Sequence, residues 1–325
     1  MEEQVFQNRV DLSGLQQAVS NIKKEVNKII VGQDPMIELL IAAVLADGHV
    51  LIEGVPGVAK TLSAKLLAKT MTVNFSRIQF TPDLMPSDII GTSIFNLKTS
   101  EFEFKQGPLF SNIVLIDEIN RAPAKTQSAL FEAMEERQIT VDGKTYPLAA
   151  PFIVLSTQNP IEQEGTYRLP EAQLDRFLFK IEVDYPSLEE ETKIISDYHG
   201  RKNTVDINTV MGVMNAAEVK DYRSKVSQVH IDANLVSYIA KIVNQTRNNS
   251  SLYLGASPRA SLAILSSSKA IAAMRGRDFV TPDDIKFVAT PVLKHRVMLT
   301  PEKEMEGITT KEVIKQIIEK IEVPR

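Results

Sequence analysis

Lys60 and Thr61 follow a turn rich in glycine and proline, and together they have the residue types that bind a triphosphate. A short apolar run leads into the turn, and a segment of helical pattern follows it. Glycine lets backbone N–H groups point inward, and the next helix directs the positive end of its dipole to the same place. Lys60 would reach the β- and γ-phosphates, and the Thr61 hydroxyl would ligate Mg²⁺. The candidate nucleotide-binding residues here are Gly54, Val55, Pro56, Gly57, Val58, Ala59, Lys60, Thr61 and Leu62.

The loop departs at one position from the general phosphate-binding pattern G-x-x-x-x-G-K-[ST]. Ala59 stands where the glycine before the lysine is expected, so we expect Gly54 and Gly57 to turn the backbone. Gly-Pro-Gly turns that bind no nucleotide are also common. The loop alone therefore leaves phosphate binding open, and the rest of the chain has to decide it.

Two acidic residues, Asp117 and Glu118, come directly after the apolar run 112–116. A continuous apolar run is typical of a buried strand in a parallel sheet, whose carboxyl end faces the ligand. Asp117 would hold Mg²⁺, and Glu118 would orient and deprotonate the attacking water. The ordinary alternative is a pair of acids that end a strand and cap a helix. Combined with Lys60 and Thr61, the pair favours hydrolysis of a nucleoside triphosphate.

Three further residues are candidates for the same site, each with an ordinary alternative. Asn159 ends the next apolar run and would position the water, although asparagine is also favoured in turns. Arg176 follows a short helical segment, where the alternative is a surface pair with Asp175. Arg259 lies in the first turn of a predicted helix, where the dipole disfavours a cation. A compensating anion is therefore expected near Arg259, either a nucleotide phosphate or a neighbouring carboxylate.

The elements that must position these residues form an α/β pattern followed by helices. Buried strands are predicted over five segments, 49–53, 74–80, 112–116, 151–157 and 177–183. The helical segments between them predict a doubly wound parallel sheet. Two alternating segments, 90–105 and 138–148, fit β-hairpins, and the second contains Asp-Gly. Only helical patterns follow Pro186, so we predict an α/β domain over 1–186 and an all-α domain over 187–325.

The composition is that of a globular protein, with 43% hydrophobic and 24% charged residues among 325. There is no cysteine, which excludes disulfides, zinc–thiolate sites and cysteine nucleophiles. The net charge of −4 gives no basic field for nucleic acid or an anionic membrane. The acidic start is unlike a signal peptide, and the longest apolar stretch, 36–46, is too short to cross a bilayer. We therefore expect a cytoplasmic protein without direct membrane insertion.

These residues resemble the MoxR group of AAA+ ATPases over nearly the whole chain. The matching motifs are Gly54-Val55-Pro56-Gly57-Val58-Ala59-Lys60-Thr61, Asp117-Glu118-Ile119-Asn120-Arg121-Ala122-Pro123, Gln158-Asn159-Pro160, Leu169-Pro170-Glu171-Ala172-Gln173-Leu174-Asp175-Arg176-Phe177 and Gly255-Ala256-Ser257-Pro258-Arg259. The resemblance implies a five-stranded AAA+ P-loop core with two inserted hairpins, followed by an all-α lid. Ala59 looks like the family's own form of the loop.

The resemblance also implies roles that spacing does not provide. Asn159 looks like sensor 1, and Arg259 looks like sensor 2. Arg176 looks like the arginine finger that reaches a neighbour's nucleotide, with Arg121 as a rival for that role. The segment of Val31, Gly32 and Gln33 resembles the adenine-side loop of the family. Families of this kind form homo-oligomeric, hexameric rings in which each site lies between two subunits, with ATP and Mg²⁺ as cofactors.

The implied function is ATP hydrolysis that drives chaperone-like remodelling or maturation of a partner protein complex. A von Willebrand factor A domain protein is the usual companion of this family. The alternative is a nucleic-acid-stimulated motor, because related rings with such inserts unwind DNA. Nucleic acid is disfavoured by the acidic net charge and by a first hairpin with only Lys98 and Lys105 as cations. A scaffold that binds nucleotide without hydrolysing it is a third reading.

Overall fold

The computed structural model describes residues 10–55, 57–159, 167, 169–201, 204 and 206–324. The contacts of the chain divide it into two compact units. The sheet unit comprises Asn21–Val219. The helical unit comprises the residues from Lys220 onward together with those before Asn21. Pro56, predicted to bind nucleotide, and Pro160 of the third motif lie outside the described residues.

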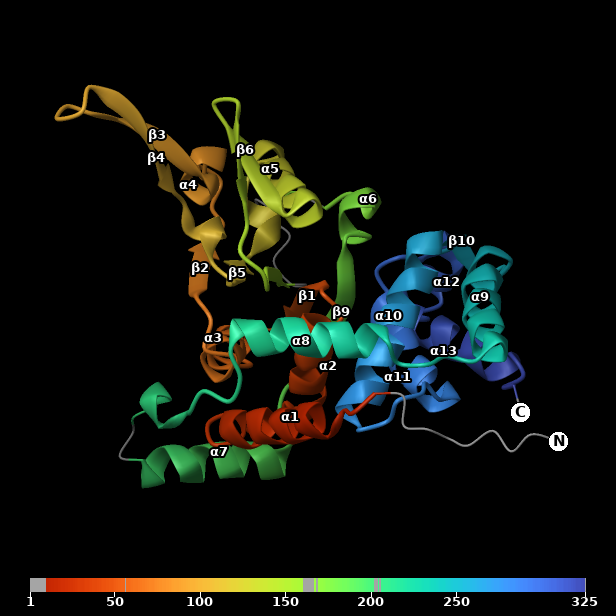
Figure 1. The fold of residues 1–325 in the computed structure, drawn as a ribbon. Coiled ribbons are helices and arrows are strands. Elements are labelled where there is room, and N and C mark those ends of the chain that lie inside the picture. Colours follow the sequence, from red (N-terminus) through yellow and green to blue (C-terminus); the bar gives the residue numbers. More distant parts are fainter. Residues whose placement is uncertain are drawn as a thin grey trace. The chain divides into compact units, whose positions relative to one another are not determined.

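Five parallel strands form the centre of the sheet unit (Figure 1). They are β1 (His49–Gly54), β2 (Phe75–Gln79), β5 (Ile113–Asp117), β8 (Ile153–Gln158) and β9 (Phe177–Val183). Their order in the sheet is β2-β5-β8-β1-β9, so the direction of winding changes beside β1. Such a switch point opens a crevice at the carboxyl ends of the strands, where α/β sheets bind ligands. The predicted five-stranded parallel core is confirmed.

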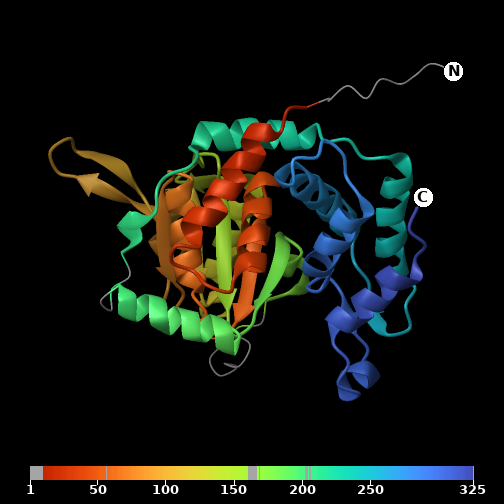
Figure 2. The same cartoon turned by 90° about the horizontal axis from the view of Figure 1, so that it is seen from below.

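Helices cover both faces of this sheet, because alternate strand residues point to opposite sides. Leu51, Val114 and Val154 belong to one buried core together with residues of α5 (Ala124–Glu136). The helix α2 (Asp34–Leu45) contacts β1 and β9, and it lies along the strands in Figure 2. The following helix α3, which begins at Lys60, contacts β2 and β5. The doubly wound arrangement is therefore also confirmed.

Two hairpins are inserted in the sheet unit, as predicted. The first is formed by β3 (Gly91–Asn96) and β4 (Glu101–Gln106), and the second by β6 (Gln138–Val141) and β7 (Lys144–Pro147). The two hairpins touch, because the Phe104 ring stacks on the Tyr146 ring with centroids 4.5 Å apart. The Ser93 hydroxyl also donates to Asp142 Oδ2 at 2.5 Å. The two hairpins are therefore in contact, and Figure 1 shows them beside α4 (Pro86–Ile90) and α5.

The segment after Pro186 contains α7 (Leu188–Gly200), whose predicted cap, Ser187, accepts a hydrogen bond from Glu190 N. Glu190 lies against Gly32, and Val213 N donates to Thr70 O at 2.7 Å. By these contacts, the segment from 187 to 219 belongs to the sheet unit. The predicted domain limits, 1–186 and 187–325, stay a prediction.

The helical unit packs four longer helices around an apolar core, as expected for a lid. They are α9 (Ala233–Arg247), α10 (Pro258–Met274), α11 (Pro282–Leu293) and α13 (Thr310–Lys320). The helices α1 (Ser13–Val26) and α8 (Ala216–Ser227) cross the division between the units, and α12 is Pro301–Met305. A two-stranded sheet, β10 (Leu252–Leu254) with β11 (Met298–Leu299), is an addition that the sequence patterns did not indicate.

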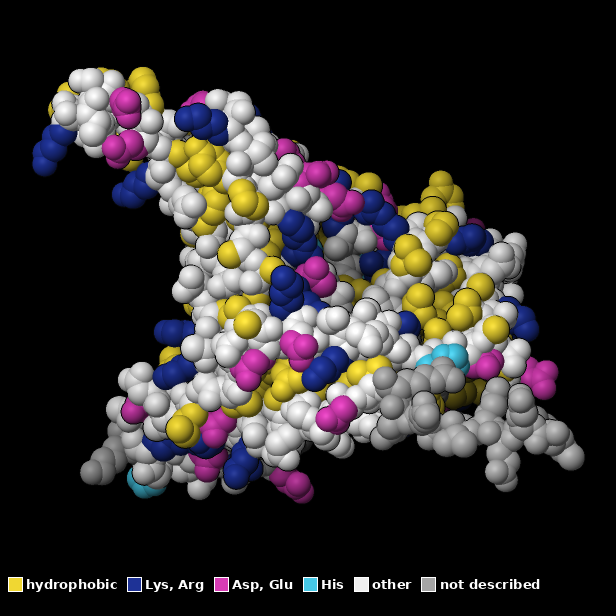
Figure 3. Space-filling view, in the orientation of Figure 1, with side chains coloured by type: hydrophobic (Ala, Val, Ile, Leu, Met, Phe, Trp, Pro, Cys, Tyr) yellow, Lys and Arg dark blue, Asp and Glu magenta, His cyan; other side chains and the backbone are white. Residues whose placement is uncertain are grey.

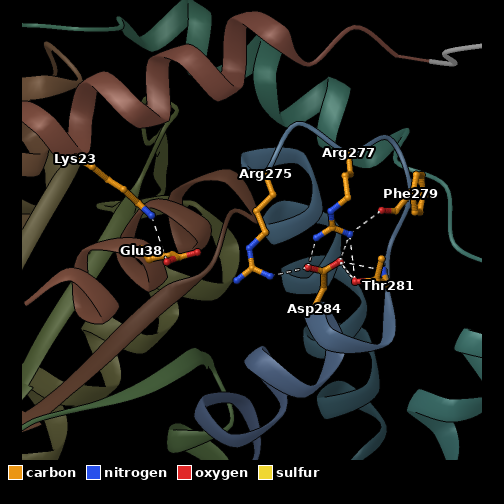
Figure 4. Close-up of polar contacts among 7 residues, drawn as sticks. All are labelled: Lys23, Glu38, Arg275, Arg277, Phe279, Thr281 and Asp284. Atoms are coloured by element: carbon orange, nitrogen blue, oxygen red, sulfur yellow. Dashed lines mark hydrogen bonds and ion pairs between the residues drawn. The ribbon is translucent and has the colours of Figure 1, made fainter. Parts of the chain in front are cut away.

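One buried carboxylate organises the start of α11 (Figure 4). Asp284 is fully buried and accepts hydrogen bonds from Arg275, from both terminal nitrogens of Arg277 and from Thr281. Burial on its own would raise the pKa of Asp284, but the bonds from Arg277 and Thr281 outweigh it and lower this pKa below its ordinary value. Throughout the described ranges, no helix is both long and apolar enough to cross a membrane.

Candidate active site

The phosphate loop joins β1 to α3 through two residues of positive φ. Gly57 has φ 89°, and Ala59 has φ 60° directly before the first helical residue, Lys60. The expectation that Gly54 helps to turn the backbone is wrong, because Gly54 still belongs to β1. A Cβ at Gly54 would lie 2.7 Å from the Val183 carbonyl oxygen of β9, so close strand packing requires this glycine. Ala59 itself takes the left-handed conformation that a glycine would adopt more readily.

The Lys60 ammonium lies at the mouth of this turn. Its Nζ donates to the Gly54 carbonyl at 2.6 Å. Burial lowers the pKa of Lys60, and the carboxylates of Asp117, Glu118 and Glu53 act in the opposite direction. A phosphate placed beside this ammonium would further stabilise its charged form. The predicted phosphate-binding lysine is therefore partly desolvated and directed to the end of β1.

Asp117 ends β5 and is held from three sides. Its Oδ2 lies 3.5 Å from the Thr61 hydroxyl and 2.6 Å from Arg77 Nε. Its Oδ1 accepts a hydrogen bond from the Thr157 hydroxyl at 3.1 Å. The carboxylate is thus oriented with one oxygen toward Thr61 of the phosphate-loop helix.

Glu118 follows in a left-handed conformation, with φ 58° and ψ 53°. Its N–H donates to the Thr157 hydroxyl at 3.0 Å. Its carboxylate Oε2 accepts a hydrogen bond from Gln79 Nε2 and pairs with Arg121 Nε, each at 2.9 Å. The side chain of Glu118 is therefore turned toward β2 and toward its own Arg121 in this arrangement.

The loop and the strand ends enclose one cavity of about 360 Å³. It is lined by Gly57, Ala59, Lys60, Thr61, Leu62, Arg77, Gln79, Asp117, Glu118, Thr157 and Asn159. Residues from four separate segments of the chain meet there, including the predicted water-positioning Asn159. The predicted meeting of the loop with the ends of β5 and β8 is found, and the chemical role of each residue remains a proposal.

Arg176 does not line this cavity, although it belongs to the same unit. Its Nη1 donates to the Phe131 carbonyl at 3.1 Å and pairs with Glu135 Oε2 at 3.0 Å. Both partners lie on α5, whereas the ordinary alternative named Asp175. The guanidinium is thus held at the C-terminal half of α5.

Other predicted residues also lie outside the cavity. Val31, Gly32 and Gln33 directly precede α2, and Gly32 has φ 77° with the Glu190 carboxylate 2.6 Å from its Cβ position. The loop therefore lies against Glu190, in the first turn of α7. Arg259 lies in the first turn of α10, in the helical unit.

The two valines of the phosphate loop complete the predicted set. Val58 is buried, and Val55 follows the last residue of β1.

Three cavity residues, Arg77, Gln79 and Thr157, were not predicted. Arg77 and Gln79 are two positions apart on β2, so they point to the same side. The sequence does contain a signal, because β2 was predicted and these polar residues alternate along it. Thr157 gives a weaker signal, since a threonine within an apolar run is common in buried strands.

The donor set fits a magnesium ion that nucleotide would help to hold. The described residues contain no group of three or more histidine, cysteine or acidic side chains that could bind a metal. A Thr61 hydroxyl and one Asp117 carboxylate do stand together, 3.5 Å apart. Mg²⁺ is often bound by one or two protein oxygens, with phosphates and water completing its shell.

A strand, a phosphate loop, a helix and a strand-end acidic pair around one cavity define a P-loop nucleoside triphosphatase. Residues 49–179 match the ATPase family associated with various cellular activities (AAA), and residues 244–317 match the AAA lid domain. The AAA match includes the phosphate loop and all five strands, except for the last residues of β9. The fold and the site therefore agree on the class.

The chain is similar to named proteins over most of its length. It is 44% identical over 310 residues to Chaperone MoxR1 of Mycobacterium tuberculosis, covering 93% of this chain and 81% of that protein. It is 48% identical to the uncharacterized protein YeaC of Bacillus subtilis, covering 93% of each. A crystal structure from Cytophaga hutchinsonii superposes with a TM-score of 0.88 at 45% identity, covering 95% of this chain and 96% of that one. The chain belongs to the MoxR family of AAA+ ATPases.

Proposed function

We propose that this ATPase hydrolyses ATP in the cavity between the phosphate loop and the ends of β5 and β8. The observation that carries the proposal is the meeting of Lys60 and Thr61 with Asp117 and Glu118 in one cavity. Lys60 would neutralise the β- and γ-phosphates, and Thr61 and Asp117 would hold Mg²⁺, which supplies further positive charge to the phosphates. Glu118 would take the proton of the attacking water.

Two arginines and one asparagine complete the proposed machinery. Asn159 lines the cavity and would position the water as sensor 1. Arg259, on the helical lid, would contact the γ-phosphate as sensor 2. Arg176 would reach the nucleotide of a neighbouring subunit, which its place outside its own cavity supports. Arg121 is the rival for that role; it pairs with Glu118 of the same chain, as Arg176 pairs with Glu135. The nucleotide base would lie near Val31, Gly32 and Gln33.

A trans-acting arginine requires an oligomer, so we propose a homo-oligomeric ring, hexameric as in related families. Hydrolysis would then depend on assembly, because an arginine supplied by a neighbour can contribute about 10³–10⁵ in rate.

The proposed use of hydrolysis is chaperone-like remodelling or maturation of a partner protein complex in the cytoplasm, with a von Willebrand factor A domain protein as companion. The joined hairpins support this, because their exposed apolar side chains offer a surface for protein (Figure 3). Leu97 is 86% exposed and Phe102 is 73% exposed. Large apolar side chains that stay in water are a common mark of protein contact.

Glu118→Gln tests the hydrolytic proposal. We expect kcat to fall by about 10²–10⁴-fold while ATP binding is retained, because only the proton acceptor is lost. Glu101→Gln, an acid-to-amide change on the first hairpin, is the matched control and should leave turnover unchanged. Equal, slow turnover by the wild type and Glu118→Gln would instead support a non-hydrolysing scaffold.

Mixing experiments test the proposed ring. Arg176→Ala should bind ATP and hydrolyse it poorly, and Lys60→Ala should fail to bind it. Mixed rings of the two variants should regain activity, since each supplies the part that the other lacks. If confirmed mixed rings show no recovery at any ratio, Arg176 does not act in trans.

ATPase assays with the wild-type protein distinguish a protein remodeller from a nucleic-acid motor. ATP turnover is measured with single-stranded DNA and, separately, with a purified von Willebrand factor A partner from the same host. We expect the von Willebrand factor A partner to stimulate turnover and DNA not to do so. Strong stimulation by DNA that falls steeply with salt would identify the nucleic-acid motor instead. Pulldown with Glu118→Gln in ATP is expected to retain the client.

A further inference from the structure

Arg77 lies at the proposed metal site, but it has no role in the reaction described above. It projects from β2 into the cavity, and its Nε lies 2.6 Å from Asp117 Oδ2. Its side chain is 53% exposed, whereas that of Asp117 is 10% exposed. A solvent-accessible cation is therefore paired with a nearly buried carboxylate.

The oxygen that Arg77 contacts is the one that faces the phosphate-loop helix. Oδ2 is also the atom that lies 3.5 Å from the Thr61 hydroxyl. The other oxygen, Oδ1, is engaged by the Thr157 hydroxyl. A divalent cation held between Thr61 and Asp117 would therefore need the same oxygen that the guanidinium now occupies.

Electrostatic repulsion prevents the Arg77 guanidinium and a divalent ion from both binding that oxygen closely. A guanidinium and a divalent ion on one oxygen would lie within a few ångströms of each other in a partly desolvated cavity, where like charges repel strongly. Asp117 is fixed by Thr157 and cannot turn away without losing that bond. Arg77 is more exposed and has a long side chain, so it is the partner that can leave.

We propose that Arg77 is a positioning residue that neutralises Asp117 in the metal-free site and is exchanged for Mg²⁺ when the metal binds with nucleotide. The proposal rests on the proposed nucleotide and metal site. Neutralisation would let the phosphates approach Asp117 before the metal arrives. Exchange would make Arg77 a competitor of Mg²⁺, so it lowers the coupling between metal binding and nucleotide binding.

Arg77→Ala tests this with binding of a fluorescent, non-hydrolysable ATP analogue. In EDTA, affinity for the analogue should fall about three- to tenfold, because Asp117 then repels the phosphates. At a fixed analogue concentration, half-saturation by Mg²⁺ should need about three- to tenfold less metal, because the competitor is gone. At saturating Mg²⁺ the affinity should approach that of the wild type.

Arg77→Lys keeps the charge and should restore most of the wild-type behaviour, whereas Arg77→Gln should match Arg77→Ala. The matched control is Lys23→Ala, which removes the cation of an ion pair elsewhere in the same unit, 3.2 Å from Glu38 Oε2 (Figure 4). It should change neither measurement. If Arg77→Ala does not fold, the Gln and Lys variants give the same comparison.

Two results would overturn the proposal. An unchanged or increased Mg²⁺ requirement in folded neutral variants would show that Arg77 does not compete with the metal. An equal loss of affinity with and without Mg²⁺ would show a merely structural role. Failure of the wild type to bind the analogue even with Mg²⁺ is a different outcome, since it would refute the proposed nucleotide site itself.

Discussion

Thr157→Val removes one hydroxyl that joins both acidic residues of the site. That hydroxyl donates to Asp117 Oδ1 at 3.1 Å and accepts the Glu118 N–H at 3.0 Å. Thr157 is buried, with 4% of its surface exposed, so water does not readily replace the lost bonds. Valine keeps the shape of threonine, and the variant therefore isolates the hydroxyl.

The loss of stability follows from the two groups left without this partner. A hydrogen bond to a charged group contributes about 1.5–3 kcal/mol, and a buried N–H without a partner costs about 1–3 kcal/mol. Asp117 keeps its pair with Arg77, so we expect a total near 3 kcal/mol rather than the sum of the upper values. For a unit of this size, that corresponds to a fall in Tm of about 6–12 °C.

The effect on turnover follows from the conformation of Glu118. With φ 58° its backbone is in the left-handed region, which costs about 1–2 kcal/mol for a residue other than glycine. The bond to Thr157 helps to hold it there. A misplacement of the base by about 1 Å can cost about 10²-fold, so kcat should fall about 10–100-fold while ATP affinity changes little.

Thr157→Ser keeps the hydroxyl and serves as the matched control. Steady-state ATPase assays and thermal unfolding of both variants, compared with the wild type, give the two required quantities. Serine should remain within about 1 kcal/mol of the wild type, because it loses only one buried methyl group. The reasoning is refuted if folded Thr157→Val and Thr157→Ser have the same kcat, or if their unfolding temperatures coincide.

Three other substitutions test single structural features by thermal or denaturant unfolding. Ala59→Gly should stabilise the chain by about 0.5–1 kcal/mol, because φ 60° strains alanine more than the added chain freedom costs; a loss of stability would contradict this. Gly32→Ala should destabilise it by about 1–2 kcal/mol, because φ is 77° and the new Cβ would meet Glu190. Asp284→Asn should cost about 3 kcal/mol at pH 7. Because the pKa of Asp284 is lowered on folding, its contribution is present above the unfolded-state pKa and is lost as pH falls through the folded-state value, so the variant should show less acid-induced loss.

The strands of the sheet could be predicted because burial leaves a strong pattern. The run Ile113–Ile116 is buried throughout, as a strand covered on both faces requires. Short elements lack such a pattern. Residues 81–88 are too rich in proline to suggest a regular element, yet α4 begins at Pro86, where proline suits a first helical turn and Asp88 accepts a hydrogen bond from Met85 N. The pairing of β10 with β11 involves so few residues that no periodicity can develop.

The candidate site was predicted where a residue's role depends on its place along the chain. Lys60, Asp117 and Asn159 each lie at or shortly after the end of a strand, so strand prediction placed them at one edge. Arg77 and Thr157 depend instead on which strands are neighbours, and strand order is not contained in local patterns. Only the order β2-β5-β8 brings both residues beside Asp117.

Both acidic residues are already engaged in this arrangement, and this has a consequence for the order of events. Asp117 is paired with Arg77, and Glu118 is paired with Arg121 and bonded to Gln79. Both of these contacts are made by Glu118 Oε2, so a water bound by that oxygen would have to displace Gln79 or Arg121. A metal held by Thr61 and Asp117 would repel Arg77, because the two cations carry like charge. On the proposed site, loading of metal and nucleotide therefore changes the partner of Asp117 before hydrolysis.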